Sequence, residues 1–399
     1  MMFSLGGPRL VDFVFPRRIV YNESLPRALE TLLGDKGVKH VLVVTDGKVA
    51  AMSWFKEAVE HVASLGVEVC IFDGVTPEPE FDVGDAIASE ARRCRAEAIV
   101  AVGGGSVIDA AKAGFVKFVR PDADLEGLAP FNYLGLEDSG IVLVAVPTTS
   151  GTGSDASYGI VLTKRVNGGR EKIAVGSYEV VPYASILDPS ITLGMPERLT
   201  VGTAVDALAH SVEAIASTNA NPLSDALAAK AAEIVFRRLP EVVNDPGNYD
   251  ARAEMHIAAT MAGMAFTNSG LGLAHAIAHP LGARLGTHHG ATVGMVLPHV
   301  VRFNESRSDY ARRKYWELKL LLESLLGLEE RGSLADHIEE LYARVGQPTR
   351  VRELAGIERE RYLTLADEVA EAAFRDPELA FNPVMPTMED VKTLLYNMY

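Results

Sequence analysis

The chain has 399 residues, of which 48% are hydrophobic and 23% are charged, a globular composition that excludes a disordered protein. Its 38 basic and 53 acidic side chains leave a formal net charge of −15, which opposes binding to nucleic-acid phosphates and to anionic lipid. No run of about 18 apolar residues occurs in the sequence, so we expect no segment to span a membrane. The length suggests two domains.

Two residue counts bear on compartment and habitat. The two cysteines, Cys70 and Cys94, are too few for a disulfide framework or a zinc ribbon, which fits a reducing cytoplasm. Residues Met1 to Arg18 contain no apolar stretch long enough for a signal peptide. The single glutamine is Gln347, and scarcity of thermolabile amides hints at a hot habitat. We expect a soluble cytoplasmic protein.

The first half of the chain alternates short apolar runs with helical patterns. Four runs rich in β-branched residues end at Gly or Pro and predict strands: Val41–Thr45, Val67–Phe72, Ala98–Val102 and Ile141–Val146. Helical patterns occupy Trp54–Ser64 and Val83–Ala96. Because the strand runs are continuously apolar, they indicate a parallel sheet with helices packed on both faces.

From about Pro196 onward the hydrophobic period is helical almost throughout, and Pro196 is expected at the first position of a helix. The longest stretches predict helices over Ala204–Ala216, Ser224–Phe236, Ala251–Phe266 and Tyr310–Leu326. We therefore expect an α/β domain over 1–190 and an all-helical domain over 191–399.

Two polar loops follow predicted strands of the first half. Gly103-Gly104-Gly105-Ser106 precedes a helical run over Val107–Gly114. The second loop, Pro147-Thr148-Thr149-Ser150-Gly151-Thr152-Gly153-Ser154-Asp155, follows the strand that ends at Val146. Glycines let a backbone approach an anion closely, and the helix that follows offers free N–H groups. The spacing is not the G-x-G-x-x-G fingerprint, and the first loop alone could be a plain turn. Two such loops at strand ends favour a nucleotide site.

The second half carries a cluster of histidines and one carboxylate. Asp206 and His210 lie four residues apart in an apolar helix, and His275 and His279 share one face of another, with His288 and His289 just beyond. Each histidine alone could be a core residue bonded to backbone. An isolated buried carboxylate is strongly disfavoured, however, and a divalent metal bound by Asp206, His210 and two of the later histidines would compensate it. Three nitrogens and one oxygen suit Zn²⁺ or Fe²⁺.

Taken together, these motifs resemble the iron-containing (group III) alcohol dehydrogenases. The resemblance runs from about Phe15 to the C-terminus. It implies a Rossmann-like N-terminal domain that binds NAD(P), a C-terminal helical domain that holds the metal, and an active site in the cleft between them. The matching motifs are Gly103-Gly104-Gly105-Ser106-x-x-Asp109-x-x-Lys112, Pro147-Thr148-Thr149-x-Gly151-Thr152, Asp206-x-x-x-His210, Gly272-x-x-His275-x-x-x-His279-x-Leu281-Gly282 and His289-Gly290.

The resemblance also assigns residues by position. The implied metal ligands are Asp206, His210, His275 and His289. His279 would lie beside the metal, either as a relay for the hydroxyl proton or as a group that orients a ligand. The implied coenzyme contacts are Gly103, Gly104, Gly105, Ser106, Thr148, Thr149, Thr152, Lys172 and Leu193, and Asp109, which could instead stabilise the start of its helix.

The resemblance also implies that Asp46, which follows the strand Val41–Thr45, faces the adenosine ribose, so we expect coenzyme choice to depend on it. A carboxylate at this position can accept a hydrogen bond from the ribose of NAD and would repel the extra phosphate of NADP, although Asp46 could simply form a turn with Gly47. We therefore expect NAD, with NADP less favoured, and Fe²⁺, with Zn²⁺ possible. The chain departs from the family pattern at Glu78-Pro79, where Asn-Pro is common, and at His288 and Val384.

The expected reaction is hydride transfer between NAD(P) and a small primary alcohol, aldehyde or diol, with the metal polarising the substrate oxygen. A metal-free reductase is disfavoured because all four ligands are present. A polyol or sugar-phosphate dehydrogenase would share the metal, but a phosphate needs a basic partner, and between His256 and Val300 only Arg284 is basic. A non-catalytic nucleotide-binding or filament subunit is a third alternative. The family resemblance also implies a homo-oligomer.

Overall fold

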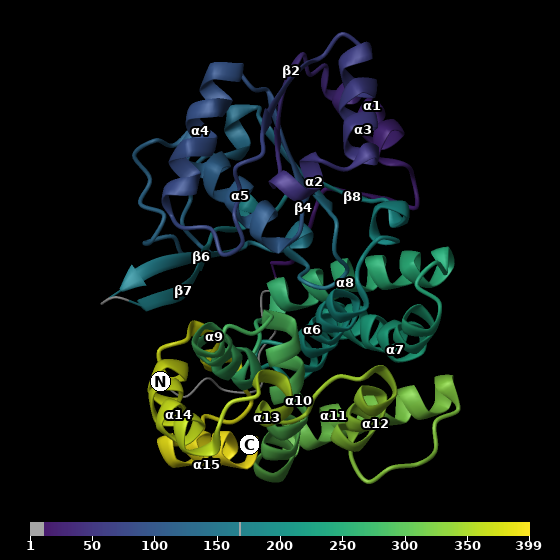
Figure 1. Cartoon of the computed structure of the whole chain (residues 1–399), viewed down its shortest axis with the longest axis vertical. Coiled ribbons are helices and arrows are strands. Elements are labelled where there is room, and N and C mark those ends of the chain that lie inside the picture. Colours follow the sequence, from purple (N-terminus) through teal and green to yellow (C-terminus); the bar gives the residue numbers. More distant parts are fainter. Residues whose placement is uncertain (1–11, 167–168) are drawn as a thin grey trace.

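A computed structural model describes residues 12–166 and 169–399 and divides them between a sheet-containing half and a helical half (Figure 1). The expectation that Met1–Arg18 carries no signal peptide falls mostly on residues outside this range. Among the described residues, no helix is long and apolar enough to cross a membrane.

The first half is built on a six-stranded sheet in the order β1-β8-β5-β4-β2-β3, with every neighbouring pair parallel. Its strands are β1 (Arg18–Tyr21), β2 (His40–Val44), β3 (Glu68–Phe72), β4 (Ala98–Gly103), β5 (Val142–Pro147) and β8 (Ala184–Leu187). The four strands expected from the sequence are confirmed within one residue at each end. β1 and β8 were missed because each has four residues, too few to show a period.

Helices cover both faces of the sheet, as the continuous apolar runs predicted. Successive residues of β2 and β4 point to opposite faces: Val41 and Val100 pack with α1 and α3, whereas Leu42 and Ile99 pack with α4 and α5. The helices of this half are α1 (Leu25–Lys36), α2 (Gly47–Ala50), α3 (Ser53–Ser64), α4 (Asp82–Cys94) and α5 (Gly105–Val119).

An antiparallel hairpin, β6 (Gly159–Val166) and β7 (Gly169–Gly176), stands outside the main sheet. Figure 1 shows it between the two halves, directly above α9, which β7 contacts. The sequence analysis did not predict this hairpin. Short 3₁₀ turns cover Glu137–Ser139, Ser154–Ala156 (η2), Tyr178–Val180, Pro189–Thr192 (η4) and Pro377–Phe381 (η5).

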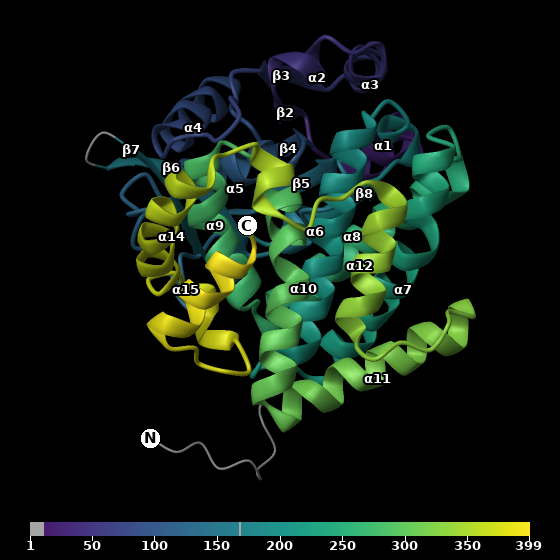
Figure 2. The same ribbon diagram turned by 60° about the horizontal axis from the view of Figure 1, so that its bottom comes forward.

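The second half is helical throughout, as expected, and is organised around one apolar core. Its helices are α6 (Glu197–Ala216), α7 (Pro222–Asn244), α8 (Tyr249–Ser269), α9 (Leu273–Leu285), α10 (His289–Arg307), α11 (Asp309–Leu326), α12 (Leu334–Val345), α13 (Val351–Ala355), α14 (Arg359–Ala373) and α15 (Met388–Asn397). In Figure 2, α10 runs through the middle of this half and α11 lies along its lower edge. Pro196 precedes α6 as its N-cap, one residue outside the predicted place.

The two cysteines correct one expectation. Cys70 in β3 and Cys94 at the end of α4 are joined by a disulfide, although the cysteine count had suggested a reducing compartment. One bond is not a disulfide framework, but it removes the cysteine count as an argument for that compartment. Intracellular proteins of hyperthermophiles are the known exception to the rule that cytosolic proteins lack disulfides.

Candidate metal centre and nucleotide-binding edge

Three helices bring the four expected metal ligands together. Asp206 and His210 lie one turn apart on α6, His275 lies in the first turn of α9, and His289 is the first residue of α10. The close crossing of α6 and α10 depends on Gly290, where a Cβ atom would lie 2.1 Å from the Gly202 carbonyl oxygen. A larger residue at 290 would push the start of α10 away from Asp206.

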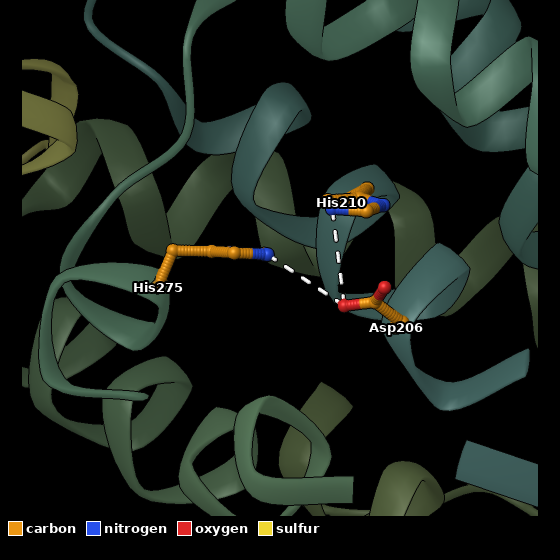
Figure 3. A group of neighbouring side chains, drawn as sticks. All are labelled: Asp206, His210 and His275. Carbon is orange, nitrogen blue, oxygen red and sulfur yellow. Dashed lines mark ion pairs between the residues drawn. The ribbon is translucent and has the colours of Figure 1, made fainter. Parts of the chain in front are cut away.

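The three histidines converge on one carboxylate oxygen. The Nε2 atoms of His210 and His275 each lie 3.8 Å from Asp206 Oδ1, and that of His289 lies 3.7 Å away. Figure 3 shows the rings of His210 and His275 both aimed at this oxygen. These distances exceed a hydrogen bond and approach the spacing of about 3.4 Å between two ligands of one tetrahedral ion at about 2.1 Å. The arrangement therefore fits a metal ion better than direct contacts.

Buried polar atoms without hydrogen-bond partners also indicate a metal ion at this place. Among the described residues, Asp206 Oδ1 and His275 Nε2 are buried with no hydrogen-bond partner, which is costly unless another group satisfies them. The ligand atoms of Asp206, His210 and His275 all lie within 4.8 Å of one another. His289 is more open, with 28% of its side chain exposed, so the centre opens toward solvent on that side.

A second carboxylate, Glu213, sits behind His275. Glu213 Oε2 contacts His275 Nδ1, and Oε1 accepts a hydrogen bond of 2.7 Å from the Ala274 backbone. Burial favours a neutral imidazole, but Glu213 and Asp206 raise the pKa of His275 to about 10. Two buried carboxylates thus call for positive charge between them, which a proton or a divalent ion at His275 Nε2 would supply. Burial lowers the pKa of His210 to about 4, which keeps this imidazole in the metal-binding form.

The sequence analysis overlooked Glu213, although a signal was present. Asp206, His210 and Glu213 stand at positions i, i+4 and i+7, so they share one helix face.

Asp376 is a second residue that was not predicted, because nothing in the sequence around it points to His279. Its Oδ2 lies 2.7 Å from Nδ1 of His279, from a segment 97 residues further along the chain. The pKa of Asp376 is lowered, because the attraction of His279 outweighs the opposing effect of burial.

His279 lies beside the cluster and not in the group that meets Asp206. Its ring stacks on the ring of His289 with centroids 5.2 Å apart, and its side chain is 12% exposed. Because an ionised carboxylate can only accept, the hydrogen in this contact lies on His279 Nδ1. His288 is exposed at the N-cap of α10.

The two polar loops meet at the carboxyl edge of the sheet. β3 lies on one side of β2 and β4 on the other, so the strand order reverses between β2 and β4, where open α/β sheets bind ligands. Gly104 caps α5 without a side-chain hydrogen bond, and Ser106 is exposed in its first turn. Thr148 N donates to Gly103 O at 3.0 Å, so the loops are adjacent. Thr148, Thr149 and Thr152 are half-buried there.

One glycine of the second loop serves packing between the halves. A Cβ atom at Gly151 would lie 2.3 Å from the carbonyl oxygen of Thr203 in α6. The second loop thus rests directly on the helix that carries Asp206. The nucleotide-binding edge and the candidate metal centre therefore lie next to each other.

Asp46, Lys172 and Leu193 occupy different settings. Asp46 Oδ1 accepts hydrogen bonds from Lys48 N at 2.8 Å and Val49 N at 3.1 Å, capping α2. Nζ of Lys172 in β7 lies 3.4 Å from Oε1 of Glu78. Glu78, which departs from the family pattern, thus forms an ion pair with Lys172, one of the coenzyme contacts that the resemblance implies. Leu193 is half-buried after η4.

The position of Asp109 contradicts one of its two expected roles, the stabilisation of the helix start. It lies in the second turn of α5, and no acidic residue occupies the first turn, so it does not stabilise the helix start. Its side chain is buried, accepts from the Ser154 hydroxyl and from Val161 N, and lies 3.6 Å from Lys112 Nζ. Both carboxylate oxygens are thus engaged within the protein.

Comparisons with known proteins agree with this arrangement. Residues 16–189 match the family "Iron-containing alcohol dehydrogenase", and residues 200–399 match "Fe-containing alcohol dehydrogenase family, C-terminal". The solved iron-containing alcohol dehydrogenase from Thermococcus thioreducens is 34% identical, with a TM-score of 0.86 and 97% of this chain and 99% of that chain covered.

Two further relatives carry coenzyme names. The NADPH-dependent butanol dehydrogenase of Clostridium saccharobutylicum is 30% identical over 98% of each chain. A sulfoacetaldehyde reductase from Bifidobacterium kashiwanohense, solved in complex with NAD⁺, is 28% identical, with a TM-score of 0.84 over 98% of this chain and 99% of that chain. Relatives with this fold thus include one named for NADPH and one that holds NAD⁺.

Proposed function

The chain belongs to the iron-containing alcohol dehydrogenase family, and from this premise we propose that Asp206, His210, His275 and His289 hold one divalent metal ion beside a nicotinamide coenzyme. The enzyme interconverts alcohols and aldehydes with NAD(P). The observation that carries the metal proposal is the convergence of three Nε2 atoms, 3.7–3.8 Å away, on the unpartnered Asp206 Oδ1. Iron is the proposed metal, with Zn²⁺ as an alternative that the same donors would accept.

The reaction divides between the cofactors and the chain. A divalent ion supplies Lewis-acid activation of the substrate oxygen, and the coenzyme supplies the hydride acceptor. His279 Nε2 accepts the hydroxyl proton during alcohol oxidation, while Asp376 holds its Nδ1–H and so fixes the tautomer. Glu213 orients the His275 ring in the same way.

The nucleotide edge holds the coenzyme. Gly103, Gly104, Gly105 and Ser106 face the diphosphate at the start of α5, and Thr148, Thr149 and Thr152 line the adjoining side. Lys172 and Leu193 complete the proposed contacts, and Asp46 faces the adenosine ribose and favours NAD over NADP.

The domain boundary, the location in the cell, the oligomeric state and the substrate class are also proposals. We place the domain boundary near residue 190, supported by the end of β8 at Leu187 and the start of α6 at Glu197. A cytoplasmic location and a homo-oligomer are proposed from the family. Small neutral alcohols and aldehydes are the proposed substrates, supported by the butanol dehydrogenase relative.

Coenzyme reduction at 340 nm across primary alcohols, diols and glycerol tests this function. Exhaustive chelation should abolish turnover, and Fe²⁺ should restore more of it than Zn²⁺. Full activity in a chelated preparation without measurable metal would contradict the metal proposal. Glycerol as the best substrate would favour the polyol alternative.

A further inference from the structure

Beneath the two polar loops lies a buried cluster of charged and hydroxyl side chains that the proposed reaction does not use. We call it the loop clasp and define it as Asp109 and Lys112 of α5 with Ser154 of η2 and Ser157, the residue that follows η2. Lys112 is fully buried. Its ammonium donates to Ser154 Oγ at 3.1 Å, Ser157 Oγ at 3.2 Å and Gly159 O at 2.8 Å. All three N–H groups are therefore used.

Asp109 completes the clasp. Its Oδ1 accepts from the Ser154 hydroxyl and lies 3.6 Å from Lys112 Nζ, and its Oδ2 accepts from Val161 N at 2.9 Å. Burial lowers the pKa of Lys112 to about 8 and raises the pKa of Asp109. Burial thus disfavours both charges, whereas their ion pair at 3.6 Å favours them. Removing one charge would leave its buried partner uncompensated.

The clasp connects the segments whose relative position determines the shape of the nucleotide edge. α5 begins in the glycine loop, η2 ends the second loop, and Gly159 starts β6. The second loop is also tied to the helical half, because Thr260 Oγ1 of α8 donates to Asp155 Oδ2 at 2.8 Å. The clasp therefore links the glycine loop to the loop that rests on α6.

We propose that Asp109 and Lys112 are positioning residues for the coenzyme, which hold the two loops at the separation its diphosphate requires and do not touch it themselves. This inference rests on the proposed nucleotide site. It assigns to Asp109 a role different from the coenzyme contact that family resemblance implies. The matched control is Lys319 of α11, which is also buried and lies 3.0 Å from Glu323. Figures 1 and 2 show α11 far from α5.

The test measures NADH affinity by fluorescence titration together with metal content and kcat at saturating coenzyme. Lys112→Met should raise the NADH Kd at least about tenfold, equivalent to about 1.4 kcal/mol, with metal content unchanged. The double variant Lys112→Met/Asp109→Asn, which removes both charges, should recover much of that loss. Lys319→Met should lower the melting temperature and leave the Kd unchanged.

A milder variant covers the case in which Lys112→Met does not fold. Ser157→Ala removes one of three acceptors with little change in volume and should raise the Kd about threefold. An unchanged Kd in the folded Lys112→Met protein, or in Ser157→Ala if Lys112→Met is insoluble, overturns the clasp. An equal loss in Lys319→Met also overturns it, because the effect would then be general destabilisation. Wild-type protein that binds neither NADH nor NADPH overturns the proposed nucleotide site and the clasp with it.

Discussion

His275 and His279 stand four residues apart on α9, yet their Nδ1 atoms meet different carboxylates. Glu213 of α6 contacts Nδ1 of His275, and Asp376, which precedes η5, contacts Nδ1 of His279. These contacts engage Nδ1 of each ring, so Nε2 is the nitrogen that can bind a metal ion or exchange a proton. His275 then faces Asp206, whereas His279 stacks on His289. Two histidines on the same face of one helix thus differ in their partners and surroundings.

This division leads to a prediction for His279. The His279→Ala substitution should lower kcat by roughly tenfold to a thousandfold, because a proton relay contributes that much, while metal content stays at the wild-type level. Asp376→Asn should produce a smaller fall in the same direction. Elemental analysis of the purified variants, run beside the kinetics, decides the point: stoichiometric metal loss in His279→Ala would make it a ligand.

The structure shows Asp46 as the residue that caps α2, and its contact with a coenzyme ribose is a proposal. One oxygen, Oδ1, caps α2 through both hydrogen bonds that the structure shows. The cap therefore engages one end of the carboxylate and does not by itself exclude contact between Oδ2 and a ribose.

The Asp46→Gly variant separates these roles, because Gly at an N-cap costs only a few tenths of a kcal/mol. The ratio of kcat/KM for NAD to that for NADP should fall by about tenfold, since a unit charge pair at about 5 Å costs on the order of 1–2 kcal/mol after screening. Lys48→Ala serves as the control for local charge. A wild-type preference for NADP, or an unmoved ratio, would leave Asp46 as a capping residue only.

At the scale of elements, the buried strands and long helices were predictable because each carries its own period. The short strands β1 and β8 and the β6–β7 hairpin were not, since their pairing is decided by tertiary contacts. The same limit applies to the site. Ligand candidates at i and i+4 were visible in the sequence, but the contact of Asp376 with His279 and the pairing of Lys172 with Glu78 depend on distant segments.

The close crossing of α6 and α10 leads to a prediction about stability and metal binding. Gly290→Ala places a methyl group 2.1 Å from Gly202 O and 2.8 Å from Asp206 Cβ, so α10 must shift and carry His289 with it. We expect a loss of about 1–3 kcal/mol in unfolding free energy from overpacking, together with weakened metal binding. Gly34→Ala in α1, where nothing lies within 4 Å, should leave both unchanged or slightly improve stability. Denaturant unfolding and metal titration compare the two variants, and equal behaviour would contradict this account of the crossing.

For the molecule as a whole, the disulfide is an unexpected contribution to stability. Cys70 and Cys94 are 24 residues apart, and closing a loop of that size stabilises a protein by about 3 kcal/mol in the chain-entropy description. Reduction, or Cys70→Ser with Cys94→Ser, should therefore lower the melting temperature of the coenzyme-binding half. Thiol titration of the native protein provides the check: two free thiols would show that the bond does not form.

In the proposed function, the two halves together build the reaction site. The first brings the nucleotide edge, the second brings the metal centre, and Gly151 allows the second loop to rest on α6. Neither half alone contains both groups that alcohol oxidation needs. The central claim is therefore that a single metal ion is held at the place where α6, α9 and α10 meet, next to that edge.

A crystal structure of the Fe²⁺-loaded enzyme, with anomalous diffraction recorded on both sides of the iron edge, tests this claim most directly. We expect one strong peak per chain, within about 2.0–2.2 Å of Asp206 and of the Nε2 atoms of His210, His275 and His289, with His279 outside that shell. A peak coordinated by His279 in place of one of these ligands, or no peak among the three helices in an active preparation, would contradict it.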